Sequence, residues 1–445
     1  MKRPRSTFPL SYERADGFIR RGTVRGAASD FARLAGPGLS PGEVAFIADQ
    51  RGSRQIAVHV ARVDLEGAHC APLEDMAYVC AGDAYACAGA TLGAYVGDAL
   101  LGRVLDAWGR TLQGTRVPGA LVSPLPSMPL SADVRAPITH VLPTGVSAID
   151  AFATLGHGQR ISLTAGAGVG KTTLLRRIVE RAGVDARVVA LVGERGREIE
   201  EAVRCLRTQP AWSTTSLYCA SSDTRPLERY GAARSATAQA EWLCREGRRV
   251  LLVIDSLTRA ALAWREIALT NGEPPAARGH PPSLHGALAS LVERAGARRD
   301  GAMTAIYTVL AEGDDPNEPV AESVRAMLDG HIALARRHAE AGRYPAVDVL
   351  RSLSRTMSEI VSPAQREDAS LVRRALATLE DAADLLAIGA YRTGSDPWLD
   401  ACVALRGQID GLVFDGERGC DDPVTRLGEV AGQLRRSPGR PAGGA

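Results

Sequence analysis

The spacing of hydrophobic and polar positions changes twice along the chain. Between residues 22 and 92, short apolar stretches are broken by Gly, Pro and Asp, and residues 55–63 (QIAVHVARV) are the clearest strand among them. This pattern predicts a small antiparallel β-barrel or sandwich over residues 22–92, which we assign as an N-terminal β-barrel. Residues 1–21 are basic and polar without a clear period, and we expect a flexible tail there.

From residue 145 to about residue 336, apolar runs of strand length alternate with stretches of helical spacing. Strands are predicted at 161–164, 187–192, 216–220, 250–254, 304–310 and 332–335, and helices are predicted to begin near residues 171, 197, 227, 257, 283 and 320. Strand, crossover helix and strand in this order predict an α/β domain with a mostly parallel sheet and helices on both faces.

The regions flanking these repeats complete the predicted organisation. Residues 93–144 are loop-rich with a proline cluster, and we assign them with the α/β repeats to one central domain, 93–356. Helical spacing over 369–387 and 397–409 predicts a helical C-terminal domain, 357–436. The Pro-, Gly- and Ala-rich residues 437–445 are expected to be disordered.

Composition narrows the class of protein. The chain has 445 residues, 45% of them hydrophobic, and a formal net charge of +2, which fits a soluble globular protein and does not demand nucleic acid or an acidic membrane. Its eight cysteines are scattered, which favours reduced thiols over a disulfide framework or a zinc site. Neither a signal peptide nor an apolar run of membrane-spanning length is recognisable, so we expect a cytosolic protein.

Residues 165–173 (AGAGVGKTT) have the pattern of a phosphate-binding loop between a strand and a helix. Glycines allow backbone N–H groups to turn toward anionic oxygens, the lysine reaches the terminal phosphates, and the threonine hydroxyl ligates Mg²⁺. The first position, glycine in the strict pattern, faces the incoming strand, so we expect its methyl group to be tolerated. The predicted nucleotide-binding residues are Ala165, Gly166, Ala167, Gly168, Val169, Gly170, Lys171, Thr172 and Thr173.

Two carboxylates follow apolar strands. Asp255 ends the strand at 250–254, and together with Thr172 it is predicted to hold Mg²⁺; the alternative is a capping residue for the next helix. Glu194 ends another strand, at the edge where such sheets bind ligands, and is a candidate base for an attacking water, with Arg195 steadying the carboxylate or the phosphates. On the residues alone, a salt-bridge cluster at a helix start is the favoured interpretation of Glu194.

Nine short motifs together resemble the rotary ATPase family, and within it the type III secretion and flagellar export ATPases. They are PTGV at 143–146, AID at 148–150, GQR at 158–160, GERGRE at 193–198, DSLTR at 255–259, GEPP at 272–275, EGDD at 312–315, DGHI at 329–332 and YPAVD at 344–348, with the loop at 165–172 between them. The GERGRE and EGDD forms differ from those of the catalytic subunit of ATP synthase.

The resemblance implies roles for further residues. It implies that Glu194 is the catalytic carboxylate, that Arg195 and Arg259 lie near the γ-phosphate, and that Tyr344 stacks on adenine. It also implies that Arg355 is an arginine finger that reaches the site of a neighbouring subunit, which requires a ring, a homo-hexamer in this family. ATP is the implied substrate and Mg²⁺ the implied cofactor.

The same resemblance implies a ring-forming ATPase that releases chaperones from export substrates and unfolds them for a type III secretion apparatus. An injectisome is favoured and a flagellum is the alternative. The implied partners are chaperones, export substrates, and the stator and central stalk proteins of the apparatus, with peripheral membrane association at its cytoplasmic face. A ring RNA helicase and a proton-coupled rotary subunit are disfavoured, the former because residues 22–92 lack a dense basic stripe and carry few aromatics.

Overall fold

The computed structural model describes residues 7–12, 17–48, 54–125, 131–166, 168–310, 319–416 and 422–437. The chain divides into two compact units. The first holds residues 1–135, 185–295 and 299–303, and the second holds residues 136–184, 296–298 and 304–445. Each unit is described by itself.

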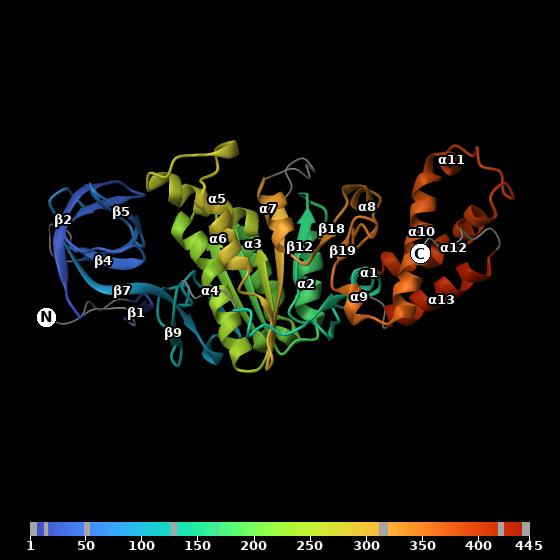
Figure 1. Ribbon diagram of the computed structural model, residues 1–445, viewed down its shortest axis with the longest axis horizontal. Coiled ribbons are helices and arrows are strands. Elements are labelled where there is room, and N and C mark those ends of the chain that lie inside the picture. Colours follow the sequence, from blue (N-terminus) through green and yellow to red (C-terminus); the bar gives the residue numbers. More distant parts are fainter. Residues whose placement is uncertain are drawn as a thin grey trace. The chain divides into compact units, whose positions relative to one another are not determined.

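The first unit begins with a closed antiparallel barrel, drawn in blue in Figure 1. Its strands follow the order β7, β2, β3, β6, β5 and β4, and β4 pairs with β7 to close the ring. Closure leaves the ring without a free edge, and alternate side chains fill its centre, among them Leu34, Ile47 and Ile56. The strands are β2 (Arg20–Ala27), β3 (Ala32–Ala35), β4 (Glu43–Ala48), β5 (Gln55–Asp64), β6 (Gly67–Pro72) and β7 (Ala84–Val96).

The segment predicted as a flexible tail takes part in this structure. Strand β1 (Leu10–Ser11) pairs with β7, and Phe8 beside it is 5% exposed. The prediction of a tail over residues 1–21 is therefore wrong for the described residues around β1 and the start of β2. A two-residue strand is too short to show a period, which explains the error.

Four parallel strands of the first unit lie in the order β15, β13, β14, β8. Helix α3 (Gly196–Arg207) connects β13 (Ala186–Glu194) to β14 (Thr215–Ser221), and α4 (Pro226–Arg245) leads on to β15 (Arg249–Asp255). Every residue of β13 is buried, as expected for a parallel strand covered on both faces. Helices α5 (Leu257–Thr270) and α6 (Ser283–Val292) follow β15.

The loop-rich segment at 93–144 contributes to both parts of the first unit. Strand β9 (Leu121–Pro124) pairs with the end of β7, and β8 (Arg103–Leu105) runs parallel to β14. Short 3₁₀ turns lie at η1 (Asp98–Leu100), η2 (Pro210–Thr214) and η3 (Ala277–Gly279). The sequence did not predict β8, because three residues are too few to set a period.

The second unit contains the strand and helix that flank the predicted phosphate loop. Strand β12 (Arg160–Ala165) pairs in parallel with β17 (Ala302–Leu310) on one side and β18 (Gly330–Ala333) on the other, and β19 (Leu353–Ser354) adds an antiparallel edge. The remaining elements before residue 361 are β10 (Val141–Leu142), α1 (Ser147–Phe152), β11 (Leu155–Gly156), α2 (Lys171–Arg181), β16 (Gly296–Ala297), α7 (Pro319–Met327), α8 (Arg336–Glu340) and α9 (Met357–Ile360).

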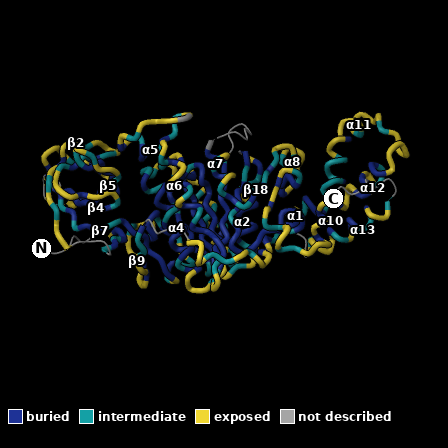
Figure 2. The backbone as a smooth tube through the Cα atoms, viewed as in Figure 1, coloured by how far each residue is buried: buried dark blue, intermediate teal, exposed yellow. Residues whose placement is uncertain are grey.

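The C-terminal part of the second unit is helical, as predicted. Helices α10 (Pro363–Asp381), α12 (Pro397–Val413) and α13 (Pro423–Arg436) contact one another and α1, while α11 (Ala383–Ala387) is mostly exposed (Figure 2). Trp398 of α12 is 5% exposed and donates its indole N–H to the Thr378 hydroxyl at 3.0 Å. It is a packing residue. Among the described residues, no helix combines the length and the apolar character that crossing a membrane requires.

Candidate nucleotide site

The phosphate loop leaves the buried end of β12 and enters α2. Ala165 is 1% exposed at the end of the strand, so its methyl group packs inward, as expected for the position where the strict pattern has glycine. Gly168 and Gly170 have φ values of 77° and 88°, a conformation that side chains disfavour. The N-cap residue of α2 is Gly170, which makes no side-chain cap, and a helix N-terminus of this kind is suited to binding an anion. Ala167 lies outside the described residues.

The side chains at the start of α2 match the predicted donor set. Val169 is 2% exposed and anchors the loop, whereas Thr172 and Thr173 are exposed and Lys171 is half-buried. An ammonium group, a threonine hydroxyl and uncapped N–H groups at one helix end fit a polyphosphate with its Mg²⁺. No cluster of three His, Cys, Asp or Glu side chains suited to a metal occurs in the part of the chain that the structure describes.

Tyr344 faces this loop. A Cβ atom added to Gly170 would lie 3.3 Å from the Tyr344 ring, so glycine at this position lets the ring approach the loop. The tyrosine is 45% exposed, and its hydroxyl donates to the Ala339 carbonyl at 3.4 Å. An accessible ring face beside a phosphate loop is suited to stacking on a base.

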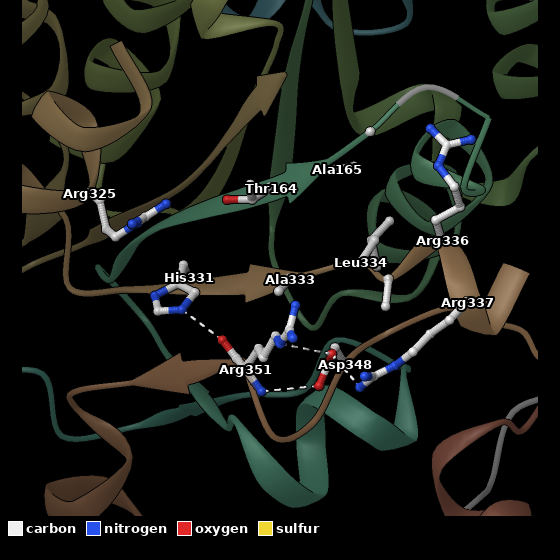
Figure 3. Close-up of a pocket in the computed structure, with 12 residues that line it drawn as sticks. Thr164, Ala165, Arg325, His331, Ala333, Leu334, Arg336, Arg337, Asp348 and Arg351 are labelled. Atoms are coloured by element: carbon white, nitrogen blue, oxygen red, sulfur yellow. Dashed lines mark hydrogen bonds and ion pairs between the residues drawn. The ribbon is translucent and has the colours of Figure 1, made fainter. Parts of the chain in front are cut away.

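A cavity of about 480 Å³ opens beside the end of β12 (Figure 3). One carboxylate, Asp348, lies among its cationic side chains; it accepts from Arg337 at 2.9 Å and from the backbone N–H of Arg351 at 3.1 Å. The excess of positive charge favours anions near the loop. The lining comprises Thr164, Ala165, Gly166, Arg325, His331, Ala333, Leu334, Ala335, Arg336, Arg337, Asp348 and Arg351.

His331 is the histidine that lines this cavity. Its Nε2 atom lies 2.7 Å from the Arg351 carbonyl oxygen and donates to it in the tautomer that this contact requires. Burial lowers the pKa of His331, and the charges of Arg325 and Arg355 lower it further. The imidazole is therefore neutral at neutral pH, and the guanidinium groups supply the charge.

Glu194 ends β13 and is 7% exposed. Arg259 from α5 holds it: Nη1 lies 2.5 Å from a Glu194 carboxylate oxygen and donates at 2.8 Å to the Gly193 carbonyl. Gly193 has φ 68°, and a Cβ atom there would lie 3.0 Å from Arg259 Cδ. Strand end, glycine and arginine thus fix the orientation of a buried acid. This arrangement is more specific than the salt-bridge cluster at a helix start that the residues alone favour.

A second carboxylate shares this environment. A hydrogen bond with the Glu194 side chain lowers the pKa of Glu198, and the backbone N–H of Arg195 and the charges of Arg195 and Arg259 act in the same direction. Arg195 itself is exposed at the N-cap of α3, beside Glu198. Its positive charge therefore acts on Glu198.

Asp255 ends β15 and is 4% exposed. The alternative from sequence was that it caps the following helix. The structure gives that role to Ser256, whose hydroxyl accepts from the Arg259 N–H at 3.2 Å. The carboxylate of Asp255 is therefore not needed as the cap.

Arg355 lies directly after β19, at the edge of the strands of the second unit. Its backbone N–H donates to the Asp329 carbonyl at 2.9 Å, while the residue is exposed. An anchored backbone with an exposed guanidinium is suited to a partner outside the chain. The EGDD motif at 312–315 lies outside the described residues.

The sequence did not reveal the cationic cavity or the pairing of Arg259 with Glu194. Arginines are so frequent in this chain that those at 325, 336, 337 and 351 carry no signal of their own. The pairing joins residues 65 positions apart, and the common spacing rules of helices and strands do not reach that far.

Comparisons with known proteins give the family context. Residues 145–354 match the nucleotide-binding domain of the ATP synthase alpha/beta family, and residues 361–417 match the C-terminal domain of the type III secretion ATPase EscN. The chain is 46% identical to a flagellum-specific ATP synthase of Salmonella typhimurium over 72% of this chain and 71% of that protein. It is 39% identical to the SPI-2 type 3 secretion system ATPase of the same organism over 88% and 90%.

A solved structure shows the same likeness. The assembled ATPase EscN of enteropathogenic E. coli has a TM-score of 0.84 and 34% identity, covering 92% of this chain and all of that chain. These matches confirm the predicted fold class: a phosphate-loop, RecA-like core of mostly parallel strands with an N-terminal β-barrel and C-terminal helices.

Proposed function

The chain belongs to the family of type III secretion and flagellar export ATPases, and from this we propose that it hydrolyses Mg·ATP to drive protein export. That it is an ATPase follows from the family itself. The observation that supports the site most directly is the loop between Ala165 and Lys171: positive-φ glycines, an uncapped helix and a lysine at its first position.

We propose that the triphosphate binds along the backbone N–H groups of residues 166–170, with Lys171 on its terminal phosphates. Thr172 and Asp255 would hold Mg²⁺, which neutralises charge that develops on the phosphoryl oxygens. The exposed hydroxyl of Thr172 and the buried carboxylate of Asp255 at a strand end support these roles. The ring of Tyr344 against Gly170 supports stacking on adenine.

We assign Glu194 as the acid that orients and polarises the attacking water. Its burial and its ion pair with Arg259 support this role, because a carboxylate fixed in one direction can aim a water in line with the γ-phosphate. In the proposal Arg259 holds Glu194 in the resting chain and moves toward the γ-phosphate during turnover. Arg195 acts by charge on Glu198, which is hydrogen-bonded to Glu194.

The proposal includes a homo-hexameric ring. The exposed guanidinium of Arg355 at an anchored strand edge supports a finger that acts in a neighbouring subunit, where such residues raise the rate by about 10³–10⁵. EscN has been solved in assembled form and in complex with its central stalk EscO. By analogy we propose a central stalk partner for this chain, with chaperones, export substrates and stator proteins as further partners at the cytoplasmic face of the membrane.

Injectisome and flagellum are two settings for the same chemistry. Relatives named type 3 secretion system ATPase, for example that of Pseudomonas syringae pv. syringae at 44% identity, support the first. The second candidate, a flagellar export ATPase, is favoured by the 46% identity to the flagellum-specific protein of Salmonella typhimurium.

Mixing two inactive variants tests the ring proposal. Arg355→Ala lacks the finger but keeps Glu194, whereas Glu194→Gln lacks the acid but keeps the finger. A mixture therefore forms some interfaces with both groups intact, and we expect it to recover phosphate release that neither variant shows alone. A mixture no more active than its parts, although size-exclusion chromatography shows mixed rings, would contradict a finger acting between subunits.

A further inference from the structure

A buried ion pair joins the helix that follows the phosphate loop to the C-terminal helices. Arg177 of α2 donates to both carboxylate oxygens of Asp415, at 2.7 Å each. The arginine side chain is 10% exposed and the aspartate side chain 1%. A two-pronged contact between a planar guanidinium and a carboxylate fixes direction as well as distance.

Further hydrogen bonds complete this contact on both sides. Arg177 also donates to the carbonyl of Gly145 at 2.9 Å and to that of Gly416 at 2.6 Å. Ser147, at the start of α1, donates its hydroxyl to Asp415 at 2.5 Å. Asp415 and its neighbours thus connect α1, α2 and the segment that leaves α12.

The same segment holds Tyr344. The backbone N–H of Gly416 donates to the Tyr344 carbonyl at 3.0 Å. The ring of Phe414 lies 5.0 Å from that of His338 and 5.5 Å from the guanidinium of Arg343. Residues 414–416 therefore hold the segment around Tyr344, whose ring lies against Gly170 of the phosphate loop.

We propose that Arg177 and Asp415 are positioning residues that set the affinity for the nucleoside part of ATP. Their ion pair fixes residues 414–416 to α2, and Gly416 in turn fixes the Tyr344 backbone at the distance at which the ring meets a bound base. The inference rests on the proposed function, in which Tyr344 receives adenine. It gives residues 414–416 a role in nucleotide binding that involves no contact with the phosphates.

This positioning role predicts that a substitution of Asp415 weakens the binding of ATP but not the binding of tripolyphosphate. ATP engages both the loop and Tyr344, whereas tripolyphosphate engages the loop alone. In Asp415→Asn we expect the KM for ATP to rise about tenfold, with kcat and the inhibition constant of Mg·tripolyphosphate unchanged. A loss of structure around the loop would weaken both ligands together.

A double-mutant cycle with Tyr344→Ala identifies the route. If Asp415 acts through Tyr344, the KM of the double variant will equal that of Tyr344→Ala alone. Three results would each overturn the proposal. The first is an unchanged KM in Asp415→Asn, and the second is an equal increase in KM and in the inhibition constant of Mg·tripolyphosphate in that variant. The third is a double variant in which the KM effects of the two substitutions multiply. If Asp415→Asn does not fold, Arg177→Lys, which keeps the charge but not the two-pronged contact, decides by the same criteria.

Asp368→Asn is the matched control. It breaks the ion pair of Asp368 with Arg435, which joins α10 to α13 within the same C-terminal helices. We expect it to change neither constant, and a tenfold KM increase there would contradict a specific role for Asp415. A wild-type chain without ATP turnover would instead contradict the proposed function, so the two failures are distinguishable.

Discussion

Two strands of this chain end at residues that we propose to act in nucleotide binding and hydrolysis, and they present opposite chemistry. Strand β12 passes into a glycine-rich loop where the backbone is open and Lys171 and Thr172 begin a helix. Strand β13 passes through a single glycine into Glu194, which is 7% exposed and paired with Arg259. One end offers donors to an anion, and the other holds an acid in a fixed direction.

The difference follows from the number of glycines and from the helix that comes next. Positive φ at Gly168 and Gly170 turns neighbouring N–H groups outward, so after β12 the backbone itself is suited to binding an anion. At β13 only Gly193 has positive φ, and the space it leaves is filled by Arg259. Binding and bond cleavage should therefore be separable by mutation.

Lys171→Ala has the largest expected effect. Removing the ammonium group leaves the terminal phosphates without their point charge, and we expect loss of ATP binding together with at least a 100-fold loss of phosphate release, on the order of the effect of a transition-state donor. Steady-state phosphate release and nucleotide binding measure this. Glu180→Ala, on the same helix but away from its N-terminus, is the control and should behave like wild type.

Glu194→Gln should distinguish most clearly between ATP binding at the end of β12 and bond cleavage at the end of β13. The amide keeps the size of the side chain but cannot act as a base, and we expect phosphate release to fall about 10²–10⁴-fold while ATP binding remains. Single-turnover measurements with the variant report the chemical step. Near wild-type turnover, or loss of binding equal to that of Lys171→Ala, would contradict a separation of binding at β12 from bond cleavage at β13.

Arg259→Ala tests how the acid is held. It leaves the carboxylate of Glu194 buried without its cation, and we expect a roughly 10–100-fold loss of kcat and about 1–3 kcal/mol of stability. Denaturant unfolding measures the second quantity. Arg249→Ala breaks an exposed pair with Asp185 in the same unit, where the partners are 54% and 42% exposed, and it should cost less than about 1 kcal/mol. Equal losses in the two variants would contradict a fixing role for Arg259.

The same comparison shows what the sequence could predict. The phosphate loop was predictable because its chemistry lies in nine consecutive residues between a strand and a helix with clear periods. Glu194 was found as a strand-end carboxylate, but the residues alone favoured a salt-bridge cluster, because burial and the distant Arg259 are not local properties. The resemblance to a family reversed this preference in favour of a catalytic carboxylate, and the assignment of site residues stays a prediction.

The parts of the fold that the sequence missed depend on pairing rather than on pattern. Strands β1 and β8 are two and three residues long and owe their conformation to β7 and β14. The ion pair of Arg177 with Asp415 spans 238 positions. In a chain with 53 lysines and arginines, no spacing rule selects that pair.

His59→Leu has the smallest expected effect on catalysis and tests whether stability alone explains the losses above. Burial and the charge of Arg234 lower the pKa of His59 to about 4, so the folded protein keeps it neutral, whereas the unfolded chain takes up a proton near pH 6.5. Stability is therefore fully present above pH 6.5 and falls as the pH drops toward 4, by at most about 3 kcal/mol.

We expect His59→Leu to flatten this dependence between pH 7 and pH 4 in denaturant unfolding, without changing kcat at neutral pH. His285→Gln, at an exposed position of α6, is the control and should keep the wild-type pH profile. A wild-type profile in the His59 variant would contradict the assignment of this dependence to His59.

Calorimetric titration of Mg·ATP into the purified chain measures whether the backbone after β12 and Lys171 bind the triphosphate. We expect saturable heat of binding in the wild type and in Glu194→Gln, and loss of this heat in Lys171→Ala. Absence of binding heat in a folded wild-type chain, or full binding by Lys171→Ala, would contradict this expectation.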